Sequence, residues 1–404
     1  MTEETARPHF LIVGAGLGGL CFAAILEKAN MSYDIYERAS AVKPLGSAIS
    51  LGPGVMPMME QLGVLDELLA KSKILGNNYS WSEQRQFLNT YDYRVTKEEF
   101  GYEAIILSRP VLYEILLKLI PKERIHFQKR VLSHVETQEG IIIRTSDGKT
   151  HQGNILVGAD GAYSGVRQCL YEQLLKEGKL PKSDAEPLSF SSVCLVGQTR
   201  PLDEDEFPIV SEEFCRFDSI RPVAQPYFLV TFTTIEKTIC WMAVLNLDKE
   251  SSKFHDSFRN SEWGPEAAET MAKEVRDFPT ICGKDKTFGD LIDLTPKELM
   301  SKVMLEEKFF ETWHGGRTVL LGDACHKMTP AAGLGAVSAL QDAVVLANYM
   351  SALKTNDPED ITKLFKYYQE ERAPQTRAAV ATSANLTRLF GRGIQKPPLA
   401  LQYG

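Results

Sequence analysis

Short apolar runs alternate with helical patterns at the start of the chain. The run His9–Val13 is rich in β-formers and precedes a glycine-rich turn, which is typical of a fully buried parallel strand. Leu17–Ala29 combines apolar and small residues, as expected for a helix packed closely on a sheet. Tyr33–Glu37 is then the next strand. The pattern predicts a strand–turn–helix–strand unit of a parallel nucleotide-binding sheet.

The alternation continues through the first half of the chain. A glycine- and proline-rich loop is followed by a predicted helix that ends near Leu69, and Ser108-Arg109-Pro110 opens a helix with an apolar face. Residues 77–107 are mixed and aromatic and predict no single element. Further strands are expected at 130–135, 141–145 and 154–157, before a polar linker at 176–186.

The middle of the chain changes to extended patterns without intervening helices. Strands are predicted over Phe190–Val196, Tyr227–Thr234 and Thr238–Leu247, which favours an antiparallel sheet. In the second of these strands, Phe228, Val230 and Phe232 alternate with Tyr227, Leu229, Thr231 and Thr233 and give one strongly apolar face. The pattern returns to helix at 257–300 and to a buried strand at 318–321. Two long helices are expected from Ala336 to about Leu353 and over 361–389.

These elements predict an α/β fold. A Rossmann-like nucleotide-binding domain would be formed by residues 1–75, 101–180 and 301–355. An inserted antiparallel-sheet substrate domain would be formed by residues 76–100 and 181–300, and a C-terminal helical segment by residues 356–404.

Composition narrows the possible classes of function. The chain has 404 residues, of which 44% are hydrophobic, and a formal net charge of −8, so a broad nucleic-acid-binding surface is not expected. The cysteines are scattered singly and the histidines form no ligand pairs at helical spacing, so we expect neither disulfides nor a metal site. We find no signal peptide and no apolar run of about 18 residues. A cytoplasmic protein without a membrane span is therefore expected.

A glycine motif follows the first strand. Gly14 allows a tight turn, Gly16 lets the backbone approach a pyrophosphate, and Gly19 allows the helix to pack against the strand. Glu37 ends the next strand, where its carboxylate can accept hydrogen bonds from a ribose 2′-OH, and the adjacent Arg38 is also predicted to contact the cofactor. A carboxylate there disfavours a 2′-phosphate, so the motif predicts bound FAD or NAD.

A later motif favours FAD over NAD. Leu321-Gly322-Asp323-Ala324-Cys325-His326 follows a strand, and the chain turns through Pro330 into the helix at Ala336. The carboxylate of Asp323 can hold the ribityl hydroxyls of a flavin, and backbone N–H groups near Gly335 and Ala336 can face its N1/O2 edge. A helix N-terminus favours the negative charge of a reduced flavin by roughly 0.3–1 kcal/mol.

With the segment Gly158–Arg167, these motifs resemble group A flavoprotein monooxygenases, the aromatic-hydroxylase family. The chain is also similar to the fungal secondary-metabolite branch of FAD monooxygenases. Asp160, Gly161, Ser164 and Arg167 match the family segment implicated in FAD and NAD(P)H binding. The resemblance spans residues 9 to about 389, and it implies a 4-hydroxybenzoate hydroxylase-like fold.

The resemblance also implies roles for single residues. Arg109 matches an FAD-contacting arginine, Gly46 lies in a loop at the flavin edge, and Pro330 matches a proline beside the reactive carbon of the flavin. Many relatives have glutamine where this chain has Leu334. For the catalytic site we select Pro330 together with Tyr227 and Arg216, two polar residues that could ionise a phenol or hold a carboxylate.

The implied reaction is an NAD(P)H-dependent monooxygenation. NADH or NADPH reduces FAD, O₂ adds to give a C4a-hydroperoxyflavin, and a small aromatic or prenylated-aromatic substrate is hydroxylated. Epoxidation of a prenyl or terpenoid chain, an NAD(P)H oxidase activity and a flavin-binding protein without turnover remain alternatives. A halogenase is disfavoured because the four tryptophans form no W-x-W motif. The substrate and the oligomeric state stay open.

Overall fold

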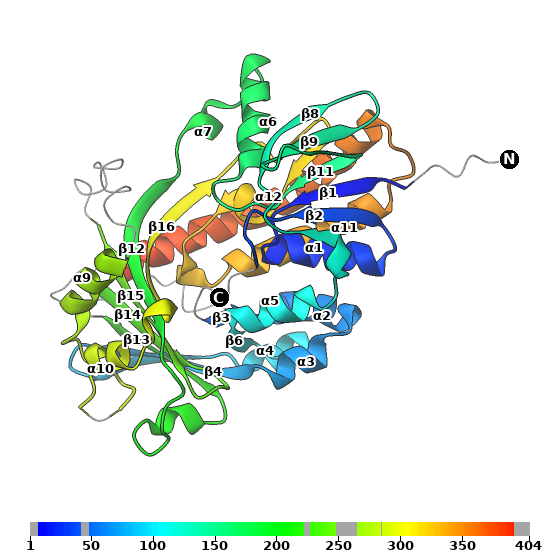
Figure 1. Ribbon diagram of the computed structural model, residues 1–404. Helices are drawn as coiled ribbons and strands as arrows, with labels where there is room; N and C mark the ends of the chain where they lie inside the picture. Colours follow the sequence, from blue (N-terminus) through cyan, green and yellow to red (C-terminus); the bar gives the residue numbers. More distant parts are fainter. Residues whose placement is uncertain (1–6, 42–47, 222–226, 248–264, 284, 392–404) are drawn as a thin grey trace.

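The computed structural model describes residues 7–41, 48–221, 227–247, 265–283 and 285–391. Two large sheets stand side by side, with helices over the first and a third, small sheet beside it (Figure 1). This arrangement confirms the predicted α/β fold with a separate substrate-domain sheet. Gly46 lies outside the described residues.

The first sheet has six strands in the order β17-β18-β11-β1-β2-β7. Neighbouring strands are parallel except β17, which pairs antiparallel to β18. The strands and their bounds are β1 His9–Val13, β2 Ser32–Tyr36, β7 Ile125–His126, β11 Ile155–Gly158, β17 His314–Gly315 and β18 Thr318–Leu320. The predicted strand–turn–helix–strand unit is thus confirmed, because α1 (Leu17–Lys28) connects β1 to β2.

Helices and a small antiparallel sheet surround these parallel strands. On one side α1 packs against α11 (Gly335–Ser351), and α5 (Arg109–Leu117) contacts α1 (Figure 1). The three-stranded sheet contains β8 Val131–Glu136, β9 Ile141–Thr145 and β10 Thr150–Gly153, and α6 (Gly165–Lys176) packs on β8. The central strands β1 and β11 are almost completely buried, as expected for a sheet covered on both faces.

The second sheet has ten strands and is larger than the sequence pattern predicts. Its order is β19-β16-β12-β15-β14-β13-β4-β6-β3, with β5 paired to β4. All pairs are antiparallel except β13 with β4. The bounds are β3 Ala48–Leu51, β4 Lys73–Ser82, β5 Phe87–Asp92, β6 Ile105–Ser108, β12 Ser189–Gln198, β13 Cys215–Arg221, β14 Tyr227–Thr233, β15 Ile239–Asn246, β16 Met300–Phe309 and β19 His326–Lys327.

Several elements depart from the sequence predictions. The segment 77–107 contains most of β4, all of β5 and β6, and the helix α4 (Val95–Phe100). β4 contains polar residues such as Asn77 and Asn78, so its sequence lacks the alternation of apolar residues that predicts a strand. The helix expected before Leu69 is split into α2 (Met56–Leu62) and α3 (Leu65–Ala70), because Gly63 adopts a left-handed φ of 78° that ends the first.

Two further regions also differ from expectation. The polar linker contains the short helix α7 (Lys182–Ala185), whose Asp184 is buried and accepts hydrogen bonds from the backbone of Glu311 and Thr312. In the segment expected to be helical, the described part forms α9 (Pro265–Val275) and α10 (Phe288–Asp293) before β16 begins at Met300. Residues 257–264 lie outside the described residues.

The long helix α12 (Pro358–Gly391) connects the two large sheets. It contacts α11 and β17 on one side and β14, β15 and β16 on the other. The domain boundaries drawn from the sequence stay a prediction, and the ten-stranded sheet includes β3 and β6 from segments assigned there to the nucleotide-binding domain.

Among the described residues, none of the helices combines the length and the apolar character needed to cross a bilayer. The cytoplasmic location stays a prediction.

Candidate functional site

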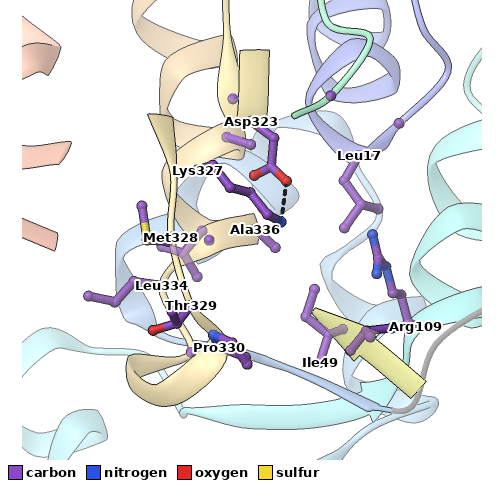
Figure 2. A pocket seen from close by; sticks show the side chains of 18 of the residues that line it. Leu17, Ile49, Arg109, Asp323, Lys327, Met328, Thr329, Pro330, Leu334 and Ala336 are labelled. Atoms are coloured by element: carbon purple, nitrogen blue, oxygen red, sulfur yellow. Dashed lines mark hydrogen bonds and ion pairs between the residues drawn. The ribbon is translucent and has the colours of Figure 1, made fainter. Parts of the chain in front are cut away.

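A cavity of about 2410 Å³ lies between the two large sheets. It is large compared with pockets for drug-sized ligands, which have volumes of about 300–1,000 Å³. Its lining includes residues from all three sequence motifs, among them Gly16, Asp160 and Asp323, together with side chains of the ten-stranded sheet. Figure 2 shows part of this lining, with Asp323, Pro330 and Ala336 on one side and Ile49 and Arg109 on the other. The fold therefore brings the three distant motifs together.

The glycine motif forms the turn from β1 into α1. Gly14 has a φ of 104°, and a Cβ there would lie 2.5 Å from the carbonyl oxygen of Ala159. A Cβ at Gly19 would lie only 2.1 Å from the carbonyl oxygen of Gly14, which places Gly19 in the helix–strand contact and not in the cavity. Gly14 and Gly16 line the cavity, and α1 begins directly after Gly16. The N-terminal N–H groups of α1 are thus placed as an anion site requires.

The carboxylate of Glu37 is held in place at the end of β2. Its Oε2 accepts a hydrogen bond from the backbone N–H of Ala15, and its Oε1 accepts one from Ala39, both at 2.8 Å. Glu37 and Arg38 both line the cavity. The carboxylate therefore links the end of β2 to the glycine turn, and each of its oxygens keeps a lone pair for a further donor. Its contact with a ribose stays a prediction.

The Asp323 motif forms a tight turn after β18. Gly322 has a φ of 61°, and residues Gly322–Ala324 form a 3₁₀ turn from which Asp323 lines the cavity. The ammonium of Lys327 pairs with its Oδ2 at 2.7 Å, and Lys327 also lines the cavity (Figure 2). Sequence analysis did not select Lys327, although its i,i+4 spacing from an acid is a usable signal.

The chain then enters α11 through a second turn. Pro330 opens a 3₁₀ turn, Gly333 has a φ of 66°, and α11 begins at Gly335 without a side-chain cap. Pro330, Gly335 and Ala336 all line the cavity. The first N–H groups of α11 have no partner within the helix, so they can stabilise negative charge in the cavity. Arg109 lines the cavity from the first residue of α5, with its guanidinium over the ring of Tyr113.

The two charged residues of the middle motif have different positions. The Oδ2 of Asp160 accepts hydrogen bonds from the backbone of Gly165 at 2.7 Å and of Val166 at 3.2 Å, and so caps α6. Burial raises the pKa of Asp160. Its Oδ1 is buried with no hydrogen-bond partner in the part of the chain that the structure describes, and Asp160 lines the cavity.

Arg167, which the family resemblance implies in cofactor binding, does not line the cavity, and its role stays a prediction. Its guanidinium donates to the carbonyl oxygens of Ala324 at 2.8 Å and Ala162 at 2.6 Å and lies 4.1 Å from the ring centre of Phe310. It is 5% exposed. Arg167 therefore supports the Asp323 turn from behind.

A buried ionic network lies under the same turn. Asp342 on α11 accepts hydrogen bonds from His326 Nε2 at 2.5 Å, Arg372 Nε at 2.8 Å and the backbone N–H of Gly322 at 3.0 Å. Burial disfavours its ionised form, but His326 and Arg372 outweigh this effect and lower the pKa of Asp342. Cys325 also lies near His326 and Asp342. Since both oxygens of Asp342 already accept charged or backbone donors, the cluster is an ion-pair network that fixes the turn and joins α12 to it.

Tyr227 and Arg216, the two polar residues predicted for the catalytic site, do not line the cavity either. Tyr227 donates a hydrogen bond to Glu274 and packs beside Phe278. Arg216 pairs with Asp218 at 2.9 Å and lies over the ring of Tyr79. The alternation of β14 already contained this information, because it puts Tyr227 on the face opposite Phe228.

The opposite face of these strands forms the wall of the cavity. Phe228, Val230 and Phe232 on β14 line it, and the apolar face predicted from their alternation is confirmed. The same surface is extended by residues of three neighbouring strands: Phe217 on β13, Met242 and Val244 on β15, and Cys194 and Val196 on β12. The part of the cavity wall formed by β12, β13, β14 and β15 is therefore mainly apolar.

Comparison with known proteins places this architecture in a family. A family model described as "FAD binding domain" matches residues 8–383. The chain is 31% identical over 396 residues to the FAD-dependent monooxygenase ptmM of Penicillium ochrochloron, which covers 95% of this chain and 89% of the relative. Among solved structures, it is similar to 2,6-dihydroxypyridine-3-hydroxylase from Arthrobacter nicotinovorans (TM-score 0.75, 18% identity, 98% and 95% of the two chains). It is also similar to Klebsiella pneumoniae HpxO complexed with FAD and uric acid (TM-score 0.72, 20% identity, 95% and 88%).

Proposed function

Because this chain belongs to the family of FAD-dependent monooxygenases, we propose that it epoxidises a carbon–carbon double bond of an apolar isoprenoid substrate. One atom of O₂ enters the epoxide, the other leaves as water, and NAD(P)H supplies the two electrons. FAD is the cofactor of the enzyme. The part of this proposal that goes beyond the family is that the substrate is an alkene and not a phenol.

The residues present fit FAD. Gly14 and Gly16 leave the backbone open beside the N-terminus of α1, and Asp323 presents a carboxylate further along the same cavity. The buried Oδ1 of Asp160 has no partner among the described residues, as expected where a ligand supplies the missing donor. The cavity volume of about 2410 Å³ leaves room for a substrate beside the cofactor.

Bound FAD, once reduced, supplies the activated oxygen. The protein contributes position and surroundings. The free N–H groups at Gly335 and Ala336 favour negative charge by roughly 0.3–1 kcal/mol. The apolar side chains of β13, β14 and β15 exclude water, which otherwise diverts activated oxygen to H₂O₂.

The observation that favours an alkene is the apolar wall itself. Aromatic hydroxylation of this kind is helped by a group that ionises a phenol, and the residues selected for that role, Tyr227 and Arg216, face away from the cavity. Transfer of oxygen to an alkene removes no proton from the substrate. A wall made of Phe228, Val230, Phe232 and Met242 suits a branched hydrocarbon chain.

The test compares the two substrate classes on one preparation. Purified FAD-loaded protein is supplied with NADPH or NADH, isotopically labelled O₂ and either the prenyl alcohol farnesol or a panel of phenols. We expect NAD(P)H consumption to rise with farnesol and the product to gain one labelled oxygen as an epoxide. Labelled oxygen in a phenol and none in farnesol would replace this proposal with aromatic hydroxylation.

A further inference from the structure

One buried polar atom in the cavity wall has no partner in the protein. The Oδ1 of Asn78, on β4, is buried and accepts no hydrogen bond from any residue that the structure describes. Asn78 lines the cavity. A buried amide oxygen without a donor is unfavourable, and such atoms are rare in folded proteins unless a ligand or water supplies the donor.

The residues around Asn78 are mainly aromatic or aliphatic. Asn78 lies opposite Phe217 on the neighbouring strand β13 and opposite Tyr91 on β5, and both of these residues also line the cavity. Nearby Leu75 and Ile106 belong to the apolar cluster that includes Phe228, Val230 and Phe232. The oxygen is therefore an acceptor placed in a largely apolar wall.

Three other polar side chains of this wall, Ser80, Ser219 and Thr96, have hydrogen-bond partners within the protein. Ser80 and Ser219 are hydrogen-bonded to each other at 3.1 Å. Thr96 donates to the carbonyl oxygen of Tyr93 at 2.8 Å and accepts from the backbone of Ala104 at 3.2 Å. None of these hydroxyls is directed to Asn78, so the amide oxygen stays available to a molecule in the cavity.

Tyr93 lies beside Asn78 in the same wall. Burial raises the pKa of Tyr93, and a hydrogen bond with the side chain of Asn78 partly opposes that rise, so the hydroxyl is protonated at neutral pH. The ring of Tyr93 meets the ring of Tyr91 edge-on, with centroids 4.9 Å apart. Tyr93 also lines the cavity, and the Oδ1 of Asn78 has no hydrogen-bond partner among the described residues.

We propose that Asn78 is a specificity-determining residue that accepts a hydrogen bond from one hydroxyl of an otherwise apolar isoprenoid substrate. This inference rests on the proposed function and narrows its substrate class to isoprenoid alcohols. The hydroxyl anchors the polar end of the molecule at β4, and the hydrocarbon part lies along Phe217, Phe228 and Phe232. A site that hydrogen-bonds a substrate hydroxyl discriminates strongly against an analogue that lacks it, since the protein group is then left unpaired.

The experiment measures binding to the oxidised holoenzyme without NAD(P)H, so that it does not depend on turnover. The probes are farnesol and farnesyl methyl ether, which keeps the oxygen and the chain but has no donor. Binding is followed by the change in flavin absorbance. We expect farnesol to bind about tenfold more tightly than the ether, as the loss of one buried hydrogen bond predicts.

Two variants locate the effect. Asn78→Leu keeps the approximate shape of the side chain and removes the amide. It is expected to weaken the binding of farnesol about tenfold and to leave the affinity for the ether within twofold of the wild-type value. Asn77→Ala is the matched control, because Asn77 is the adjacent residue of β4, donates to Thr90 and does not line the cavity. It is expected to change neither affinity.

Equal affinities of the wild-type protein for the two probes, equal losses in Asn78→Leu, or no binding of either probe would overturn the subsite. The proposed function is tested separately, by whether labelled oxygen from O₂ enters the product. Epoxidation of the ether as efficiently as farnesol would keep the function and reject the subsite. Donor-dependent binding of farnesol without any oxygen transfer would reject the function while the subsite keeps its binding signature.

Discussion

The two sides of the cavity are built in different ways. On the cofactor side, short contiguous segments present backbone groups and fixed charges, as at Gly14–Gly16, Glu37 and the start of α11. On the substrate side, single side chains come from alternate positions of strands far apart in the chain, such as Asn78, Phe217 and Val244. The cofactor side is therefore a property of local turns, whereas the substrate side is a property of sheet register.

The comparison predicts different consequences of mutation. On the cofactor side, changes should act on the backbone turn and thus on folding and FAD retention together. On the substrate side, substitutions should leave FAD bound and change the fraction of NAD(P)H consumption that is coupled to oxygenation of the substrate.

The largest effect is expected at the glycine turn. In Gly19→Ala the new Cβ would lie 2.1 Å from the carbonyl oxygen of Gly14, so the helix must move from the strand, with a loss of about 4 kcal/mol or more in stability and of bound FAD. Gly16→Ala is the matched variant, since its Cβ would meet only the carbonyl oxygen of Ala159 at 3.8 Å. It should fold normally and bind FAD more weakly. Thermal unfolding and FAD content measure both, and equal melting temperatures for the two variants would contradict this account.

The next effect is expected at the buried network behind the same turn. Asp342→Ala leaves Arg372 buried without its carboxylate and should cost about 3–5 kcal/mol in the free energy of unfolding. Glu371→Ala, at the adjacent exposed position of α12, is the control and should cost less than about 1 kcal/mol. Urea unfolding gives both values. A small loss in Asp342→Ala would mean that the turn does not depend on the network.

The same network gives a pH dependence. The pKa of Asp342 in the folded protein lies below its ordinary value of 3.8, so the unfolded state binds this proton more readily. The stabilisation is fully present above about pH 5 and is lost as the pH falls through the lower folded pKa. Unfolding free energies measured from pH 6 downward should therefore fall more steeply for the wild type than for Asp342→Ala. Parallel curves for the two proteins would be evidence against a stabilising role of the ionised Asp342.

A moderate effect is expected on the substrate side. Phe232→Ala opens the apolar wall and should let water reach the flavin, so that a larger share of NAD(P)H yields H₂O₂ while FAD content is unchanged. Leu229→Ala, on the opposite face of the same strand, should destabilise the protein by about 2–5 kcal/mol without this uncoupling. The ratio of H₂O₂ formed to NAD(P)H consumed separates them, and uncoupling in both variants would show that general loosening is the cause.

The smallest effect is expected at Tyr227. Tyr227→Phe removes the hydrogen bond to Glu274 on the face away from the cavity, at a cost of about 1 kcal/mol in stability, and kcat should stay within twofold. Steady-state kinetics with the identified substrate provide the check. A tenfold fall in kcat with FAD retained would return Tyr227 to the catalytic site and remove one of the two arguments for an alkene substrate.

Sequence reasoning succeeded best where function depends on a few adjacent residues. The placement of Gly14, Gly16, Glu37, Asp323 and Pro330 around one cavity agrees with their selection from local motifs, although their contacts with FAD remain to be measured. It did not predict that the guanidinium of Arg167 donates to two backbone carbonyls, because a motif does not say on which side of a helix a long side chain finds its partner. It also missed Lys327, which pairs with Asp323 and lines the same cavity.

By itself, the sequence determined the parallel nucleotide-binding unit, the FAD family and the apolar face of β14. Each of these follows from the spacing of residues close together in the chain, through backbone conformation or through the two-residue period of a strand. Only the tertiary structure decided that β4 pairs with β13, that Arg216 faces away from the cavity, and that Asn78 lines it. The physical reason is that sheet register between distant segments is set by packing of the whole core, which no local pattern contains.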